Sequence, residues 1–99
     1  MTKPVNRMRP VHPGEVLREE FLRPLGLSVN PLAGELRVPA TRIHEIVNER
    51  RGITADTAVR LARYFDTSAE VWLNLQTAYD PKTLPTLADI ERRVTPRAV

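Results

Sequence analysis

The sequence has no cysteine, and its longest uninterrupted apolar run is only Val71-Trp72-Leu73. Without cysteine, the chain can form neither a disulfide scaffold nor a zinc site with thiolate ligands. The apolar run falls far short of the ~20 residues that a membrane-spanning helix needs. No apolar stretch near the N-terminus has the pattern of a secretory signal. We therefore expect a cytoplasmic protein without a membrane segment.

Aromatic residues are also scarce, at 5% of the chain. This disfavours a stacking platform for single-stranded nucleic acid, because such platforms rely on aromatic side chains. Hydrophobic residues make up 41% and charged residues 27%, an ordinary globular composition. With 99 residues, the chain has the length of one domain with one modest core. Fifteen basic against twelve acidic residues give a net charge of +3, which permits a nucleic-acid partner without demanding one.

The pattern of reactive side chains does not indicate an enzyme. His44 and Glu45 begin a near match to the zinc-binding His-Glu-x-x-His helix, but Asn48 stands where the second histidine must be. The chain has no glycine-rich phosphate loop and no serine in a nucleophile setting. His12, with Glu15 following, is more simply explained as a cap at the start of a helix. We expect no catalysis, no metal and no cofactor.

Apolar residues recur with helical spacing along most of the chain, and no segment alternates convincingly like a strand. The fold class expected is therefore all-α. Helices are predicted over about 13–23, 30–37 and 39–49, with a fourth capped by Thr54 and a fifth capped by Ser68.

The helix boundaries follow from residues that cap or break helices. Pro24 and Gly26 are expected to end the first helix, and either Ser28 or Asn30 to cap the second. Val38 precedes a proline and so avoids helical geometry, which separates the second helix from the third. The core predicted from the apolar stripes is Leu17, Phe21, Leu32, Leu36, Ile43, Ile46, Leu61, Phe65, Val71, Trp72 and Leu75.

The third predicted helix has a polar face opposite its apolar stripe of Ile43, Ile46 and Val47. A short helix held by another across a tight turn, with such a face, suits the DNA major groove. The alternative is an ordinary solvated helix surface. Arg50 and Arg51 follow at the exit, where cations could contact phosphates. The polar face consists of Thr41, Glu45 and Asn48, flanked by Arg42 and His44.

The spacing of Ala33, Ile43 and Ile46 resembles the helix-turn-helix unit of the Cro/lambda-repressor-like family, with residues 28–47 as the bihelical unit. Several short blocks within about residues 8–80 add to this resemblance: His12-Pro13-Gly14-Glu15, Arg42-Ile43-His44-Glu45-Ile46, Arg51-Gly52-Ile53-Thr54, Thr57-Ala58-Val59-Arg60-Leu61-Ala62 and Trp72-Leu73-Asn74-Leu75-Gln76. These blocks are similar to those of the HigA subfamily of antitoxins, which includes proteins labelled virulence-associated protein I.

This resemblance implies a five-helix DNA-binding domain with a short C-terminal helical extension. It divides the chain into a basic N-terminal arm at 1–11, the helix-turn-helix domain at 12–80 and a tail at 81–99. The arm contains Lys3, Arg7 and Arg9, and a short helix over 87–94 is one interpretation of the tail.

The resemblance also implies site residues and partners. The partners would be double-stranded DNA with a palindromic operator, a RelE-like ribonuclease toxin and a second copy of the chain. DNA bases would be read by Ala40, Thr41, Arg42, His44 and Glu45, and phosphates held by Ser28, Asn48, Arg50 and Arg51. Two-fold pairing would set two recognition helices about 34 Å apart, one DNA turn. Our hypothesis for the dimer interface is Leu73, Leu87, Ile90 and Val94.

Three departures from the family pattern weaken parts of this interpretation. Arg37 stands where glycine is usual, which implies either a strained residue or a different turn. Val29 replaces a glutamine that commonly touches phosphate, and Pro39 replaces a Ser or Thr cap. Two alternatives therefore remain open. One is a solitary helix-turn-helix regulator without a toxin, and the other is a toxin-binding module with weak DNA binding.

Overall fold

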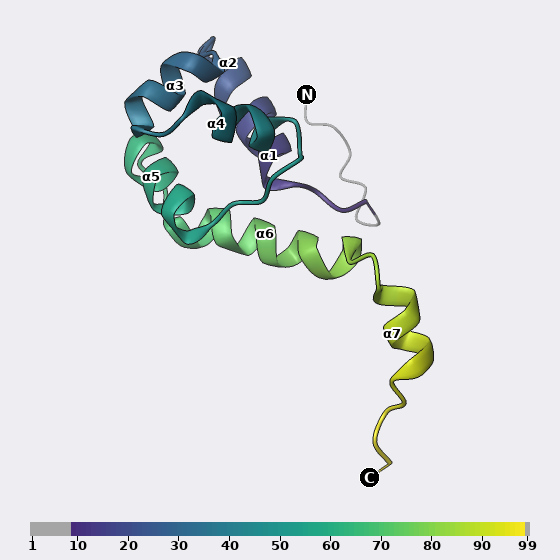
Figure 1. Cartoon of the computed structure of the whole chain (residues 1–99). Coiled ribbons are helices and arrows are strands. Elements are labelled where there is room, and N and C mark those ends of the chain that lie inside the picture. Colours follow the sequence, from purple (N-terminus) through teal and green to yellow (C-terminus); the bar gives the residue numbers. More distant parts are fainter. Residues whose placement is uncertain (1–8, 99) are drawn as a thin grey trace.

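The computed structural model describes residues 9–98, and every regular element within them is a helix (Figure 1). The expected all-α class is confirmed. Lys3 and Arg7 of the predicted arm lie outside the described residues. The elements are α1 (Pro13–Val16), the π-helical segment η1 (Leu17–Leu22), α2 (Arg23–Leu25), α3 (Val29–Leu36), α4 (Ala40–Val47), α5 (Ala55–Phe65), α6 (Ala69–Thr83) and α7 (Leu87–Arg93).

The first three elements follow one another without a break and act as one helix. His12 begins it, because its Nδ1 accepts a hydrogen bond from the Gly14 N–H at 2.8 Å, so the capping role is confirmed. The expected stop at Pro24 is wrong, since the helix continues to Leu25. The wider π-helical turn before Pro24 gives its ring more room than an α-helical turn would. Gly26 ends the helix in the left-handed conformation, with φ 62°.

The core lies where the first helix, α3, α4, α5 and α6 meet. Two aromatic pairs close its edge, with Phe21 4.8 Å from Phe65 and 5.1 Å from Trp72 between ring centroids. Phe21, Phe65 and Leu75 are half-buried rather than fully buried, because they lie at this edge. Six apolar side chains are completely buried: Leu17, Leu32, Ile43, Ile46, Leu61 and Trp72.

For one residue, Val71, the predicted place in the core is wrong. Val71 is 49% exposed, whereas Trp72 beside it is completely buried and donates its indole N–H to Thr67 Oγ1 at 3.0 Å. At about 100° per residue, Val71 and Leu73 lie on opposite sides of Trp72, and because Ala69 and Leu73 pack on the core, the buried face is shifted toward them and away from Val71. The same rotation brings Leu73 and Leu75 onto opposite edges of the buried face, where both pack on the core.

The C-terminal part of the chain extends away from this body. α6 continues past Pro81 to Thr83, and α7 follows at its far end, remote from α5 (Figure 1). Four large apolar side chains near or on α7 are exposed, by 37% to 64%: Leu84, Leu87, Ile90 and Val94. Over residues 9–98, no helix combines the length and the hydrophobicity that crossing a membrane would require.

Candidate nucleic-acid interface

α4 is embedded on one side and open on the other. Ile43 and Ile46 are completely buried, and Val47 is 6% exposed. On the opposite side Thr41, His44 and Asn48 are exposed and Glu45 is half-buried. Arg42 is half-buried on a flank, and the half-buried Ala40 packs against the core. Among the expected base-reading residues, Thr41 and His44 are therefore the most accessible, and Arg42 and Glu45 are partly covered by their own neighbours.

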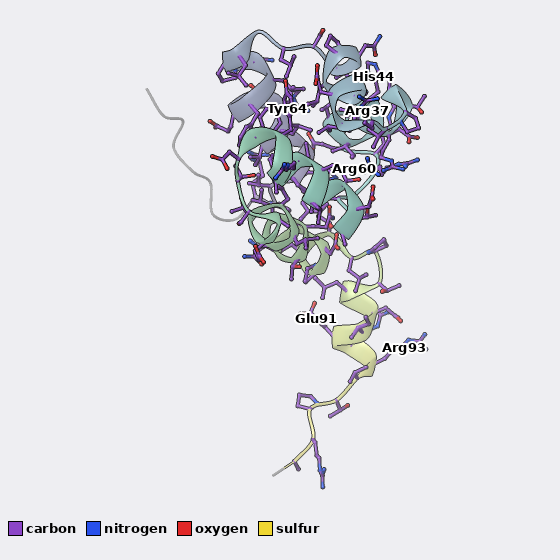
Figure 2. The ribbon with its side chains drawn as sticks, turned by 90° about the vertical axis from the view of Figure 1, so that its left-hand side faces the viewer. Arg37, His44, Arg60, Tyr64, Glu91 and Arg93 are labelled. Atoms are coloured by element: carbon purple, nitrogen blue, oxygen red, sulfur yellow. The ribbon has the colours of Figure 1, made fainter. Side chains whose placement is uncertain are left out.

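The turn before α4 contains Arg37, one of the three residues that depart from the family pattern. Arg37 ends α3 with φ 61° and ψ 44°, so the strained alternative is the correct one. A non-glycine residue is costly in this region, and the surrounding structure must hold it there. Arg60 of α5 does so, because its Nη1 donates to the Leu36 carbonyl at 2.8 Å (Figure 2).

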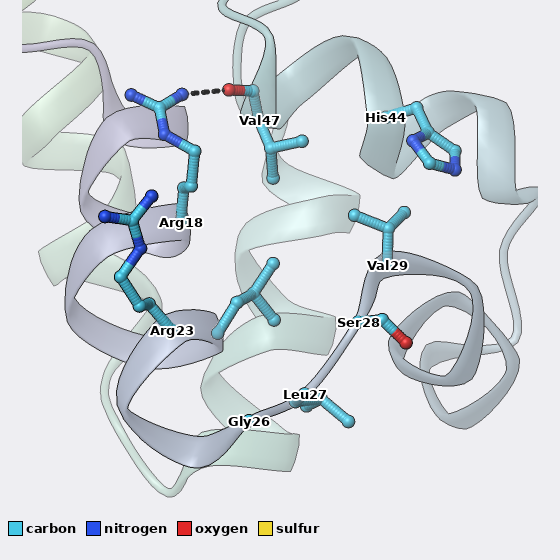
Figure 3. Close-up of a pocket in the computed structure, with 9 residues that line it drawn as sticks. Arg18, Arg23, Gly26, Leu27, Ser28, Val29, His44 and Val47 are labelled. Carbon is cyan, nitrogen blue, oxygen red and sulfur yellow. Dashed lines mark hydrogen bonds between the residues drawn. The ribbon is translucent and has the colours of Figure 1, made fainter.

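The far end of α4 is fixed by the first helix. A Cβ at Gly14 would lie 1.7 Å from the Ile46 carbonyl oxygen, so only glycine permits this approach. Arg18 donates a hydrogen bond to the carbonyl of Val47, where a helix carries unpaired carbonyls (Figure 3). Arg18 also lies 3.4 Å from Glu49, just beyond the helix end. Together these contacts fix how far α4 projects from the body.

The loop after α4 is held by α6 in a way that explains two of the sequence blocks. Gln76 accepts a hydrogen bond from the Ile53 N–H at 2.6 Å, and its own amide donates to Asp80 at 2.7 Å. A Cβ at Gly52 would come within 2.8 Å of the same Gln76 oxygen. The Gly-Ile-Thr block and the Trp-Leu-Asn-Leu-Gln block are therefore in direct contact through Gln76.

One of the expected base-reading side chains, Arg42, already has a charged partner. Arg42 Nη1 lies 3.0 Å from Asp56 Oδ2, and Arg60 Nε lies 2.8 Å from the same oxygen. The hydrogen bond from Arg60, with a further one from Arg42, lowers the pKa of Asp56. Sequence reasoning placed Asp56 only in the first turn of α5. Its spacing of four residues before Arg60 was a signal for the local pair but not for Arg42.

A second pair joins two residues to which different roles were assigned. Arg51, an expected phosphate contact, lies 2.7 Å from Glu45, an expected base reader. In this conformation, Glu45 partly neutralises Arg51. His44 similarly has a partner on α3, with its Nε2 3.0 Å from Asn30 Oδ1. Asn30 was considered only as a helix cap, and the α3–α4 packing that brings it to His44 is not visible in the sequence.

The start of α3 offers groups suited to a phosphate. Ser28 is the N-cap, but its exposed side chain makes no capping hydrogen bond, so the hydroxyl stays available for a ligand. Asn48 and Arg50 are exposed beyond the end of α4. Between these two ends lies a shallow groove of about 510 Å³ (Figure 3). Its lining includes Ser28 and His44, together with Val29, whose apolar side chain cannot replace the glutamine usual there.

The expected dimer residues fall into two groups. Leu73 is half-buried and packs against the core of its own chain. Leu87, Ile90 and Val94 are 37%, 40% and 64% exposed. The last three have helical spacing, so they share one side of α7 and its end.

Comparisons with known proteins agree with this arrangement. The profile of the Helix-turn-helix family matches residues 17–72. Virulence-associated protein I of Dichelobacter nodosus is 62% identical over 77 residues, which are 78% of this chain and 71% of that protein. The structure of Pseudomonas aeruginosa antitoxin HigA with the higBA promoter superposes with a TM-score of 0.86 at 48% identity, covering 91% of this chain and 100% of that one. Antitoxin GraA in complex with its operator gives a TM-score of 0.84 at 42% identity, covering 98% and 100%.

Proposed function

The chain belongs to the Helix-turn-helix family, in the group that contains HigA antitoxins and virulence-associated protein I, and on this premise we propose that it binds operator DNA through α4. The observation that carries the proposal is the two-sided character of α4. Ile43 and Ile46 are completely buried, while Thr41 and His44 on the other side are exposed and accessible to a DNA groove. Two solved relatives that superpose closely are named as complexes with promoter or operator DNA.

The roles within this interface follow from reach and chemistry. Thr41 can contact a thymine methyl group, with Ala40 beside it. Arg42 can read the O6 and N7 of guanine, and Glu45 can accept from the amino group of cytosine. His44 adds a further hydrogen-bonding ring. Phosphates on either side would be held by Ser28, Asn48, Arg50 and Arg51.

A titration of variants separates base reading from phosphate binding. The probe is a labelled duplex of the DNA upstream of the reading frame, followed by fluorescence anisotropy at several salt concentrations. If Arg42 reads a base, Arg42→Ala costs about 1–3 kcal/mol on the operator and flattens the preference at one position. Arg50→Ala should weaken binding to all sequences alike and reduce the salt slope by about one unit. Unchanged binding in both Arg42→Ala and Thr41→Ala would show that α4 is not the recognition helix.

The proposed operator is palindromic because we propose that the protein acts as a homodimer. The exposed apolar side of α7 supports this, since Leu87, Ile90 and Val94 contribute little to the core of their own chain. Leu73 would contribute only its exposed part. Sedimentation at high micromolar concentration should give a dimer, and Leu87→Glu combined with Ile90→Glu should give a monomer. A wild-type monomer under those conditions would contradict the proposal.

The finer proposal is that the chain represses its own operon and neutralises a RelE-like ribonuclease toxin. Its support is the similarity to HigA antitoxins. The first contact surface to test is the N-terminal arm with the first helix, because these parts are not assigned to DNA. Co-expression with the neighbouring gene product should give a complex that co-purifies. Failure to co-purify would leave a solitary regulator. A toxin complex with DNA binding that is weak at every salt concentration would favour a toxin-binding module.

A further inference from the structure

The geometry points to Asp56 as a specificity-determining residue, which holds Arg42 in one orientation so that α4 distinguishes its operator from other DNA. This inference rests on the proposed function, DNA binding through α4. Asp56 itself is not one of the residues assigned to bases or phosphates. It acts through Arg42, and it is therefore a positioning residue.

The first argument is how Asp56 is itself held. Its Oδ2 receives Arg60 Nε at 2.8 Å and Arg42 Nη1 at 3.0 Å. Arg60 cannot swing freely, because its Nη1 also donates to the Leu36 carbonyl at 2.8 Å. A chain of contacts therefore runs from the end of α3, through Arg60 and Asp56, to Arg42 on α4. Its origin is backbone, so Asp56 is a fixed acceptor rather than a flexible surface acid.

The second argument is that the two ion pairs of Asp56 contribute little to folding. The Asp56 side chain is 56% exposed, and those of Arg42 and Arg60 are 30% and 39% exposed. Ion pairs at such exposure contribute little to stability, because water and salt screen them. The network lies beside the polar face of α4, which is where the orientation of a side chain would matter for recognition.

The third argument is what an unrestrained Arg42 would do. A mobile guanidinium can turn toward whichever phosphate is near, and that contact is the same on every sequence. A guanidinium held by Asp56 must give up a charged hydrogen bond before it can follow a phosphate. It needs no such rearrangement for a guanine edge that lies in its fixed direction. Asp56 thus penalises non-operator DNA more than operator DNA.

The test uses Asp56→Asn, which keeps the shape of the side chain and removes its charge. Dissociation constants are measured for the operator duplex and for a scrambled duplex of equal length. We expect scrambled DNA to bind more tightly and the ratio of the two constants to fall about fivefold, the lower end of the discrimination from one bidentate base contact. Glu35→Gln is the charge control. It removes one exposed acid from α3 that forms no ion pair with Arg42, and should leave the ratio unchanged.

The decisive comparison repeats Asp56→Asn in an Arg42→Ala background. Loss of an acid near DNA strengthens binding to all sequences whether or not Arg42 is present. Loss of positioning changes the ratio only when Arg42 is present. An equal fall of the ratio in both backgrounds, or no fall with Arg42 intact, would overturn the inference while wild-type operator binding stands. Absence of operator binding by the wild-type protein would overturn the proposed function itself.

Discussion

Gly14→Ala should separate the first helix from α4, although alanine is the better helix former. The added Cβ would lie 1.7 Å from the Ile46 carbonyl oxygen and 2.7 Å from its carbonyl carbon. Ordinary van der Waals contact begins at about 3.5 Å, so the two helices must move apart by roughly 2 Å. Both obstructing atoms belong to the backbone of a buried residue, and neither can turn aside.

The expected magnitude follows from two opposing effects. Overpacking typically costs about 1–3 kcal/mol, and a forced backbone shift belongs at the upper end or beyond. Alanine returns up to about 1 kcal/mol through helix propensity. The net loss is therefore at least about 2 kcal/mol in the free energy of unfolding. For a domain of this size, it corresponds to a fall in Tm of roughly 8–16 °C.

Thermal unfolding followed by circular dichroism at a fixed protein concentration measures this effect. Gly34→Ala is the matched control, because Gly34 also lies in a helix but an added Cβ there meets no atom within 4 Å. This control should gain about 0.5–1 kcal/mol. A Gly14→Ala protein as stable as the wild type would refute the argument from close approach. An equal loss in Gly34→Ala would show that the effect is not specific to this contact.

Three further predictions concern other named residues. Burial lowers the pKa of His12 below its ordinary value of 6.5, so below pH 6.5 the unfolded chain binds more protons than the folded one. The free energy of unfolding should therefore decline as the pH falls from 6.5 toward the lowered pKa. His12→Asn, which keeps a capping acceptor, should flatten this decline in urea titrations at several pH values. Arg37→Gly should raise Tm by relieving about 1 kcal/mol of left-handed strain, whereas Arg37→Ala, which keeps the strain, should not. Phe65→Ala should lower the free energy of unfolding by less than the ~3–5 kcal/mol lost at a fully buried phenylalanine. The loss should also be smaller than that of Ile43→Ala in the same chemical denaturation series, because Phe65 is half-buried and Ile43 is completely buried. The reverse order would count against the described core.

Local chemistry predicted much of this fold. Thr54 and Ser68 cap α5 and α6 by accepting from the N–H groups three residues later, as their positions indicate. These caps depend on a few consecutive residues, and the sequence displays them directly. The left-handed conformation of Arg37 was indicated only through the family resemblance, because that family usually has glycine at this position. Val71 was misassigned because the apolar run Val71-Trp72-Leu73 does not itself show which member faces away from the core.

The candidate site was only partly visible in the sequence. Periodicity identified the two sides of α4, because the buried stripe of that helix is regular. It could not show that Arg42 meets Asp56 or that Glu45 meets Arg51, since these pairs depend on how elements cross in space. The link from Gln76 to Ile53 spans 23 residues and was likewise hidden, although both residues lie within recognised blocks.

The same hydrogen bond makes α6 a rigid spacer between α4 and α7. Near its middle the helix is hydrogen-bonded, through Gln76, to the loop that leaves α4, and its C-terminal end leads to α7. In a dimer formed through α7, the length of α6 would therefore set both the separation and the relative rotation of the two α4 helices. Inserting one residue between Thr77 and Ala78 lengthens the helix by about 1.5 Å and turns its far end by about 100°. Such an insertion should leave each subunit able to fold and to bind one half-site. The two α4 helices of the dimer should then no longer match the spacing of the two half-sites in a palindrome.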